Sequence, residues 1–212
     1  MNTESHPKKR ITGEIPDLSG EVLDRAMSGD HGAFTQIVRH YEQMVFNFSF
    51  KVCRDRAFAE ETLQDTFVNV YKKLNQFDKR SKFSTWLYSI VTNNCLMKRR
   101  RRKLEEDSVS IDEPGMPHNH EGNHPDSMES HLQAWQGTPL DESMNKELRT
   151  LLDDAIQKLP LDYRLVFILR DLEGRSVEET AKVMKLSLAA TKSRLRRARV
   201  FLREQLDEYM SS

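Results

Sequence analysis

Cysteine is scarce in this 212-residue sequence, which contains only Cys53 and Cys95. Both lie within apolar helical patterns rather than in a paired framework, so we expect buried, reduced thiols and no disulfide. Long apolar runs are also missing. The longest candidate, Tyr163–Leu169, is far too short for a bilayer, which takes roughly 20 apolar residues, and no apolar stretch follows the basic Lys8–Arg10. We therefore expect no membrane insertion, no secretory signal and a cytoplasmic location.

Recognisable catalytic motifs are missing as well. The sequence has no glycine-rich phosphate loop and no nucleophile–base pair in context, and acidic pairs such as Glu178-Glu179 suit a helix cap or a solvated face. His118, His120 and His124 cluster, but no cysteine or further acidic ligand stands at metal-binding spacing. The sequence therefore predicts a protein that is not an enzyme and that uses no cofactor or metal.

Positive charge is absent from one long segment, although the whole chain is formally neutral, with 33 basic and 33 acidic residues. Residues 104–143 hold 10 acidic residues and no lysine or arginine, whereas residues 20–103 hold 16 basic and 9 acidic residues. Residues 144–212 are also basic, with 14 against 11. Basic blocks of this kind favour nucleic-acid binding when their cations lie beside aromatic residues or on a helix-turn-helix.

The acidic strip is rich in helix-breaking residues and poor in apolar periodicity. Four prolines and three glycines fall between residues 107 and 143, so this segment cannot bury enough surface to offset its ordering entropy. We predict an all-α protein of two small helical domains, 20–103 and 144–212, joined by a flexible acidic linker over 104–143. Residues 1–19 are expected to form a disordered tail.

Helical periodicity organises the first basic block. Apolar residues recur there at steps of three and four, and residues 29–32 separate a short first helix from a longer second one. A third helix follows from Ala57. Its predicted buried stripe comprises Phe58, Leu63, Phe67, Val70, Tyr71 and Leu74. After a polar turn over 77–83, Ser84 is expected to cap a last helix that runs from Thr85 to about Lys103.

The second block ends in a helix-turn-helix pattern. Ser176 and Glu179 form a capping box at the start of a short helix, and a tight turn over 185–187 leads into a long basic helix. The predicted buried face of the long helix comprises Leu188, Thr191, Leu195, Ala198 and Leu202. This layout places the long helix in the major groove of DNA. An amphipathic helix with a merely solvated basic side is the less favoured alternative.

Several side chains point away from that buried face or flank it, and these are the first set of candidate DNA contacts. They are Lys192, Ser193, Arg196, Arg197 and Arg199. A small residue such as Ser193 allows close approach to DNA, while the forks of Arg196 and Arg197 fit guanine edges or phosphates.

A second basic site lies at the end of the first block. Aromatic and amide side chains there precede six consecutive cations, Lys98–Lys103. This combination favours binding of single-stranded or splayed bases, because stacking and backbone charge together hold unpaired strands. The candidate contacts are Phe83, Trp86, Asn93, Lys98, Arg99 and Arg100. The alternative is that the aromatic residues belong to the core.

Three segments, taken together, resemble the extracytoplasmic-function sigma factors of bacterial RNA polymerase. The segment Phe83–Ile90 (FSTWLYSI), with the basic run after it, is similar to the promoter-melting and minus-10 segment of that family. The segment Ala59–Phe67 (AEETLQDTF) resembles the polymerase-binding helix. Residues 159–174 and the helix-turn-helix resemble the minus-35-binding domain. The order of the three matches the family, and only the tail and the linker fall outside the similarity.

The resemblance implies a sigma factor that binds core RNA polymerase and directs promoter-specific transcription initiation. It assigns polymerase docking to Glu61, Gln64, Asp65 and Asn69. It also implies that Asn93 helps to capture a flipped base of the minus-10 element, and that the helix-turn-helix residues contact the minus-35 element. The family further implies an anti-sigma partner that wedges between the two domains.

Two other functions stay open at this point. A conventional helix-turn-helix regulator would bind a duplex operator by itself, usually as a dimer on symmetric half-sites. An enzyme is the other alternative, although no motif in the sequence supports it.

Overall fold

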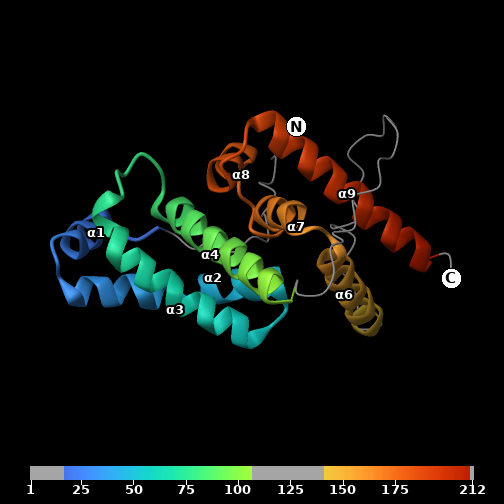
Figure 1. The fold of residues 1–212 in the computed structure, drawn as a ribbon, viewed down its shortest axis with the longest axis horizontal. Helices are drawn as coiled ribbons and strands as arrows, with labels where there is room; N and C mark the ends of the chain where they lie inside the picture. Colours follow the sequence, from blue (N-terminus) through green and yellow to red (C-terminus); the bar gives the residue numbers. More distant parts are fainter. Residues whose placement is uncertain (1–16, 107–140, 211–212) are drawn as a thin grey trace, which may run out of the picture.

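Helices make up every regular element in the part of the chain that the structure describes. The computed structural model describes residues 17–106 and 141–210, with side chains for 17–102 and 150–207. No strand occurs in these ranges, and the helices fall into two units, one on each side of the gap (Figure 1). The predicted all-α architecture is therefore confirmed. Most of the predicted linker lies outside the described residues.

The first unit consists of α1 (Gly20–Met27), α2 (His31–Cys53), α3 (Arg56–Lys73), the 3-10 turn η1 (Leu74–Gln76) and α4 (Phe83–Glu106). Aspartates cap two of these helices. Asp30 accepts a hydrogen bond from the Ala33 N–H of α2 at 3.0 Å, and Asp55 accepts one from the Phe58 N–H of α3 at 3.0 Å. Each carboxylate satisfies a backbone donor that has no partner inside its helix.

Aromatic side chains fill the core between α2, α3 and α4. Tyr41, Phe48, Phe58, Phe83 and Tyr88 are each no more than 2% exposed. The rings of Phe48 and Tyr88 pack edge to face with centroids 5.3 Å apart, and those of Tyr41 and Phe83 are also 5.3 Å apart. Such pairs contribute about 0.5–1.5 kcal/mol beyond their area burial, so they fix α4 against α2.

The N-terminus of α4 is capped from a distant part of the chain. The helix begins at Phe83, and the expected cap, Ser84, lies inside it. The Ser84 N–H donates instead to Asp17 Oδ1 at 3.1 Å, and the Tyr41 hydroxyl donates to the same oxygen at 3.0 Å. Asp17 belongs to the predicted tail, of which residues 1–16 lie outside the described part of the chain. Its carboxylate therefore caps a helix 67 residues further along.

The second unit consists of α6 (Asp141–Lys158), α7 (Leu161–Phe167), the π-helical turn η2 (Ile168–Leu172), α8 (Val177–Met184) and α9 (Leu188–Met210). The predicted capping box of α8 is confirmed. Ser176 Oγ accepts from the Glu179 N–H at 3.0 Å, and Glu179 accepts from the Ser176 N–H at 2.9 Å. The predicted turn is also confirmed, because Lys185 leaves α8 in a left-handed conformation and α9 begins three residues later.

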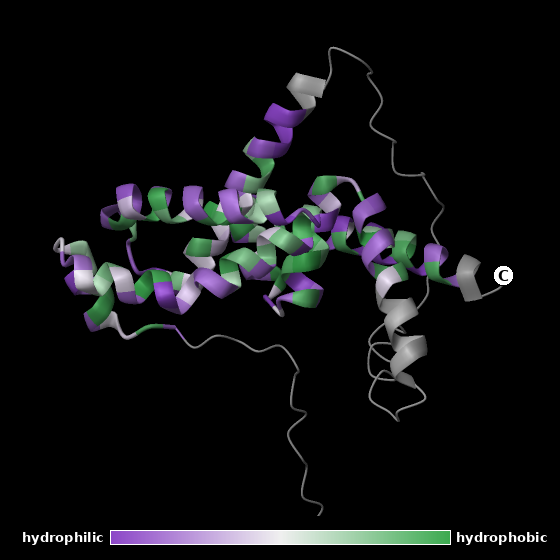
Figure 2. Cartoon of the chain, turned by 90° about the horizontal axis from the view of Figure 1, so that it is seen from below, coloured by the Kyte–Doolittle hydropathy of each residue, from purple (hydrophilic) through white to green (hydrophobic). Residues whose placement is uncertain are grey.

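The two units pack directly against each other. Helix α8 lies on α4, while α7 and η2 approach α2 (Figure 1). Figure 2 shows hydrophobic residues gathered where the helices meet and hydrophilic residues on the outside. Glu173, whose side chain is 14% exposed, joins the units: it accepts from the Tyr88 hydroxyl at 2.6 Å and from Lys51 Nζ at 2.7 Å.

Other polar contacts cross the same interface. Arg164 donates to the Val52 carbonyl at 2.7 Å. Arg175 is only 4% exposed, and its guanidinium carbon lies 5.1 Å from the centroid of the Tyr88 ring. Because buried polar groups cost free energy unless they are paired, these contacts favour one register between the units.

Two residues predicted to be buried lie on the surface instead. Tyr71 is 56% exposed and Leu188 is 47% exposed. The Tyr71 ring still packs against two rings of α2, that of Phe34 with a centroid distance of 5.1 Å and that of His31 with a centroid distance of 6.3 Å. Both positions sit at the edge of an apolar stripe, where periodicity indicates the face of a helix but not how far the neighbouring helix extends over it.

The cysteines follow the prediction: Cys95 is buried, Cys53 is partly buried, and both are free thiols. Burial raises the pKa of each thiol, so both stay protonated at neutral pH. No helix in the described ranges has the length and apolar character needed to cross a membrane.

Candidate nucleic-acid interface

Helix α9 presents a continuous cationic surface opposite its buried face. Thr191, Leu195, Ala198 and Leu202 are buried in the second unit, as the periodicity predicts. Four of the candidate minus-35 residues are exposed on the other side, namely Lys192, Ser193, Arg196 and Arg197. The turn that positions them is held by Ser187, whose hydroxyl accepts from the Ala190 N–H at 3.1 Å.

The fifth residue of that set, Arg199, has a different environment. Its guanidinium donates two hydrogen bonds to the Asp171 carboxylate, at 2.9 and 2.7 Å. The Asp171 side chain is only 9% exposed. This bidentate pair joins α9 to η2, so in this structure Arg199 positions the recognition helix rather than extending its DNA-facing surface.

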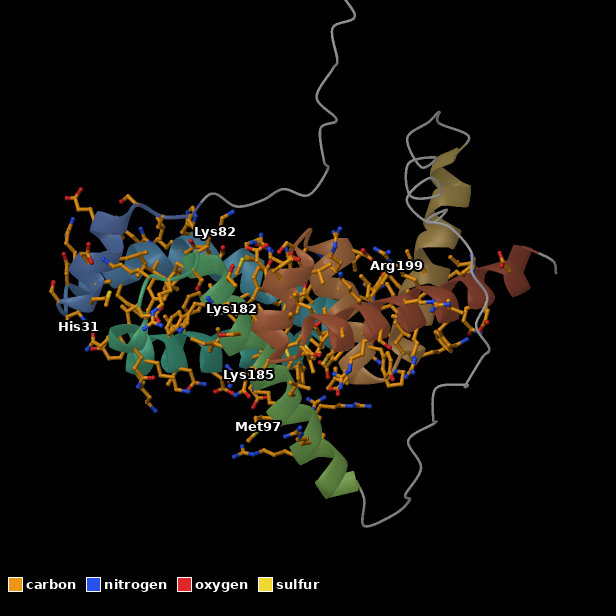
Figure 3. All side chains as sticks on the ribbon, turned by 90° about the horizontal axis from the view of Figure 1, so that it is seen from above. His31, Lys82, Met97, Lys182, Lys185 and Arg199 are labelled. Carbon is orange, nitrogen blue, oxygen red and sulfur yellow. The ribbon has the colours of Figure 1, made fainter. Side chains whose placement is uncertain are left out.

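Two further lysines of the helix-turn-helix, Lys182 on α8 and Lys185 directly after it, were not singled out by the sequence patterns. Lys182 and Lys185 are exposed, and Figure 3 shows both where α8 passes α4, on the same side as Met97 of α4. The signal that could have revealed them is the helix-turn-helix itself, because its first helix crosses the DNA backbone.

Along α4, three candidate minus-10 residues share one strip. Trp86, Asn93 and Arg100 follow at steps of seven, which brings them to the same side of a helix. Asn93 and Arg100 are exposed, and Trp86 is partly buried, with its ring 5.4 Å from that of Phe77. Met97 lies between them and is 49% exposed. The strip thus combines an amide, a cation and apolar surface.

Two other candidates on α4 point elsewhere. Phe83 is 2% exposed and packs among the core aromatic rings, which is the alternative that the sequence left open. Lys98 lies 2.8 Å from Glu61 Oε1 and 2.8 Å from Asp65 Oδ2 of α3, and its side chain is only 12% exposed. In this structure neither side chain is available to DNA, because each is engaged within the first unit.

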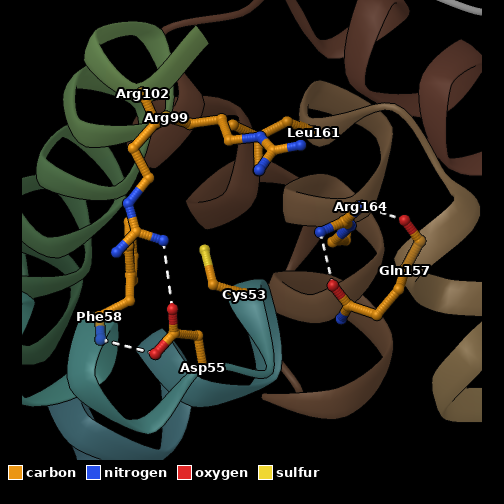
Figure 4. Close-up of a pocket in the computed structure, with 8 residues that line it drawn as sticks. All are labelled: Cys53, Asp55, Phe58, Arg99, Arg102, Gln157, Leu161 and Arg164. Atoms are coloured by element: carbon orange, nitrogen blue, oxygen red, sulfur yellow. Dashed lines mark hydrogen bonds and ion pairs between the residues drawn. The ribbon is translucent and has the colours of Figure 1, made fainter. Parts of the chain in front are cut away.

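The remaining candidate from the basic run is Arg99, which lines a pocket between the two units (Figure 4). It therefore lies on a different side of α4 from the strip of Trp86, Asn93 and Arg100. The six predicted minus-10 residues do not form one surface. A consecutive run of cations on a helix spreads its charges around the axis at about 100° per residue.

The polymerase-binding candidates lie on α3. Glu61, Gln64 and Asp65 are exposed on one face. Asn69 is turned toward α4, where its amide donates to Asn94 Oδ1 at 3.0 Å. The same face of α3 also carries the exposed side chains of Val68 (51%) and Tyr71 (56%). Neither was a predicted polymerase-binding residue, and Tyr71 was predicted to be buried.

The described residues contain no group of three or more His, Cys, Asp and Glu side chains arranged to hold a metal ion. The clustered histidines 118, 120 and 124 lie outside the described residues.

Two sigma-factor family models match the chain: Sigma-70 region 2 over residues 37–105, and Sigma-70, region 4 over residues 149–202. The extracytoplasmic-function RNA polymerase sigma factor SigW of Bacillus subtilis is 28% identical over 186 residues, which cover 87% of this chain and 94% of that protein. The RNA polymerase sigma-H factor of Pseudomonas aeruginosa is 31% identical over 183 residues, which cover 84% of this chain and 89% of that protein. This chain is an extracytoplasmic-function sigma factor.

Solved structures agree with the fold of this sigma factor. CnrH in complex with the cytosolic domain of CnrY is 24% identical with a TM-score of 0.58, and the match covers 89% of this chain and 96% of that chain. The sigma factor RpoE of Bartonella quintana, in complex with the anti-sigma factor NepR, is also 24% identical with a TM-score of 0.58, covering 82% and 96%. The region 2 match spans most of α2 through α4, and the region 4 match includes the helix-turn-helix.

Proposed function

We propose that this sigma factor divides its work among three surfaces: α3 for core RNA polymerase, one strip of α4 for the minus-10 element, and the exposed face of α9 for the minus-35 element. The protein binds core RNA polymerase and directs promoter-specific initiation, as its family does. The observation that carries the proposal is the exposure of two separate sets of DNA-compatible side chains, one in each unit. We assign the units to residues 20–103 and 144–212.

The minus-35 assignment depends on Lys192, Ser193, Arg196 and Arg197. Their exposure and their position on the second helix of a helix-turn-helix support base or phosphate contacts in the major groove. Arg199 supports them indirectly through its pair with Asp171. Lys182 on α8 and Lys185 at the C-terminal end of that helix are suited to contact the flanking phosphates.

The minus-10 assignment depends on Trp86, Asn93 and Arg100. An exposed amide beside an aromatic ring and a cation suits a flipped base, whose unstacking costs a few kcal/mol that the pocket must offset. Phe83 contributes by holding Trp86 in place, since their ring centroids are 5.4 Å apart. Lys98 contributes by joining α4 to α3, and Arg99 is assigned a different role below.

The polymerase assignment depends on the exposed face of α3. Glu61, Gln64 and Asp65 provide its polar groups, and Val68 and Tyr71 provide apolar surface of the kind that lies at the centre of protein interfaces. Asn69 lies at the edge of this face through its bond to Asn94.

Two further roles follow from the family. We propose an anti-sigma partner, because the sigma factor RpoE of Bartonella quintana, which has the same fold, is bound to the anti-sigma factor NepR in its solved structure. We also propose that the protein acts in the cytoplasm and without enzymatic activity of its own, since the chemistry of transcription belongs to the polymerase that it joins.

Reconstituted transcription tests the assignment. Core RNA polymerase and the full chain are incubated with a promoter identified from transcript start sites, and abortive and run-off products are measured. Arg196→Ala and Asn93→Ala are each expected to reduce initiation roughly tenfold or more, since each removes a specific contact of about 1–3 kcal/mol. Arg39→Ala, which removes an exposed cation of α2, is the matched control and should leave initiation within about twofold.

Footprinting separates the two elements, because permanganate reports unpaired thymines at minus-10 and DNase I reports protection of the duplex at minus-35. Loss of Asn93 should reduce melting at minus-10 while the minus-35 element stays protected, whereas loss of Arg196 should reduce protection at minus-35. Equal effects of all three variants would contradict the assignment. A gel-shift with and without core enzyme tests the rival regulator, because tight binding to a duplex operator by the chain alone would favour that function.

A further inference from the structure

A small pocket lies between the two units, away from the three surfaces discussed above. Its volume is about 160 Å³. Cys53, Asp55, Phe58, Arg99 and Arg102 line it from the first unit, and Gln157, Leu161 and Arg164 from the second (Figure 4). The space is several times what one water molecule needs but is smaller than the sites that hold drug-sized ligands.

The pocket contains more positive than negative charge. Three arginines line it, against the single carboxylate of Asp55. That carboxylate already accepts from the Phe58 N–H at 3.0 Å and from Arg102 at 3.2 Å. Arg99 has no carboxylate partner within the described part of the chain. Arg99 is exposed on α4 and Arg102 is already paired with Asp55, so the lining keeps an excess of positive charge that attracts an anion.

Arg164 also has no negatively charged hydrogen-bond partner within the described residues. Its two terminal nitrogens make four hydrogen bonds, all to neutral oxygens: the Val52 carbonyl at 2.7 Å, the Leu159 carbonyl at 2.9 Å, and both the carbonyl and the side-chain oxygen of Gln157. Its Nε is buried and has no hydrogen-bond partner. Burial lowers the pKa of Arg164, and the nearby Arg99 cation lowers it further. A negative charge beside it would raise this pKa and so oppose both effects.

We propose that this pocket is a binding site for a small tetrahedral oxyanion of the phosphate class. Guanidinium groups present paired N–H donors that match phosphate oxygens, and this lining is rich in donors and poor in free acceptors. The donors available to such an anion are the Arg99 guanidinium and the Nε–H of Arg164, because the Gln157 amide already donates to the Lys51 carbonyl at 3.1 Å and accepts from Arg164 at 2.7 Å. Either a free phosphate or a phosphate group on a larger molecule, including the DNA backbone, would fit this binding site.

Occupation of the site would join the two units. Arg99 and Arg102 belong to α4, whereas Arg164 belongs to α7. An anion held by arginines of both helices is a charge-neutralising bridge across the interface, so it stabilises the packed arrangement of the units over a separated one.

Isothermal titration calorimetry of the full chain with sodium phosphate tests the site, with sodium chloride of matched ionic strength as the reference. Saturable phosphate binding is expected. Arg99→Gln should weaken it roughly tenfold or more, because one charge-assisted donor pair is lost. Arg101→Gln is the matched control: Arg101 is also exposed on α4 but does not line the pocket, so binding should stay within about twofold. Circular dichroism confirms that each variant is folded.

Absence of phosphate binding beyond that of chloride would overturn the proposal, and so would an equal loss in the two variants, since that result means only diffuse charge attraction. A short duplex without promoter sequence identifies the source. If the duplex displaces phosphate from the wild-type protein, the pocket binds a phosphate of the DNA backbone. If the duplex and phosphate bind together, the pocket binds a free anion. Either result supports the proposed anion-binding site.

Discussion

The contact between Tyr88 and Glu173 offers the sharpest test of how the two units are held together. The Tyr88 hydroxyl donates to Glu173 Oε2 at 2.6 Å, and the Tyr88 side chain is 1% exposed. A hydrogen bond to a charged acceptor contributes about 1.5–3 kcal/mol. Lys51 also binds this carboxylate, but its side chain is 40% exposed, so solvent screening limits that pair to about 0–1 kcal/mol. The tyrosine bond should therefore dominate.

A double-mutant cycle measures this bond. Tyr88→Phe, Glu173→Ala and the double variant are unfolded in urea and followed by far-UV circular dichroism. Each single variant should lose about 1.5–3 kcal/mol of unfolding free energy, and the double variant should lose much less than the sum, giving a coupling energy of similar size. Glu42→Ala, at an exposed position of α2, should change stability by less than about 0.5 kcal/mol.

A coupling energy below about 0.5 kcal/mol would refute the reasoning, because it would mean that the two groups do not depend on each other in solution. The m-value serves as an internal check. A lower m-value in the single variants would show that the units separate before they unfold, since less surface would then be exposed in the observed transition.

Two further predictions concern pH and the recognition helix. Burial, and then the Glu173 charge, raises the pKa of Tyr88 above its ordinary value of 10. Its stabilising contribution should therefore be complete below pH 10 and fall above it, by about 1.4 kcal/mol per pH unit, as the unfolded chain loses a proton that the folded one keeps. Urea midpoints between pH 9 and 11 should show a smaller decline for Tyr88→Phe, and parallel declines would contradict this. Arg199→Ala should cost about 1.5–3 kcal/mol, because it removes the charge-assisted hydrogen bonds to the largely buried Asp171. Arg203→Ala on the same helix is the control. Equal stability of the two variants would mean that Arg199 does not hold α9 in place, and would instead favour a DNA-binding role for it.

Local patterns in the sequence were sufficient for the helices and their caps. Step-three and step-four periodicity placed the buried face of α9 and left Lys192, Ser193, Arg196 and Arg197 on the outside. The capping box at Ser176 needs only residues three apart, so it could be identified without any knowledge of the rest of the chain.

Other candidate-site residues depended on neighbours that are distant in the sequence. Lys98 meets Glu61 and Asp65, and Arg199 meets Asp171, because separate helices pack side by side. A run of six cations predicts a basic end of α4, but it does not say which cation turns toward α3, which toward the other unit and which toward solvent.

The sequence by itself determined that the chain folds into helices, where the helix-turn-helix lies and which face of α9 is exposed, because those features follow from dihedral preferences and spacing within a few residues. Only the tertiary structure decided that Asp17 caps α4, that Glu173 joins the two units and that three arginines from two helices line one pocket. Those features depend on how helices far apart in the chain pack together, and the residues next to each of them in the sequence do not determine that packing.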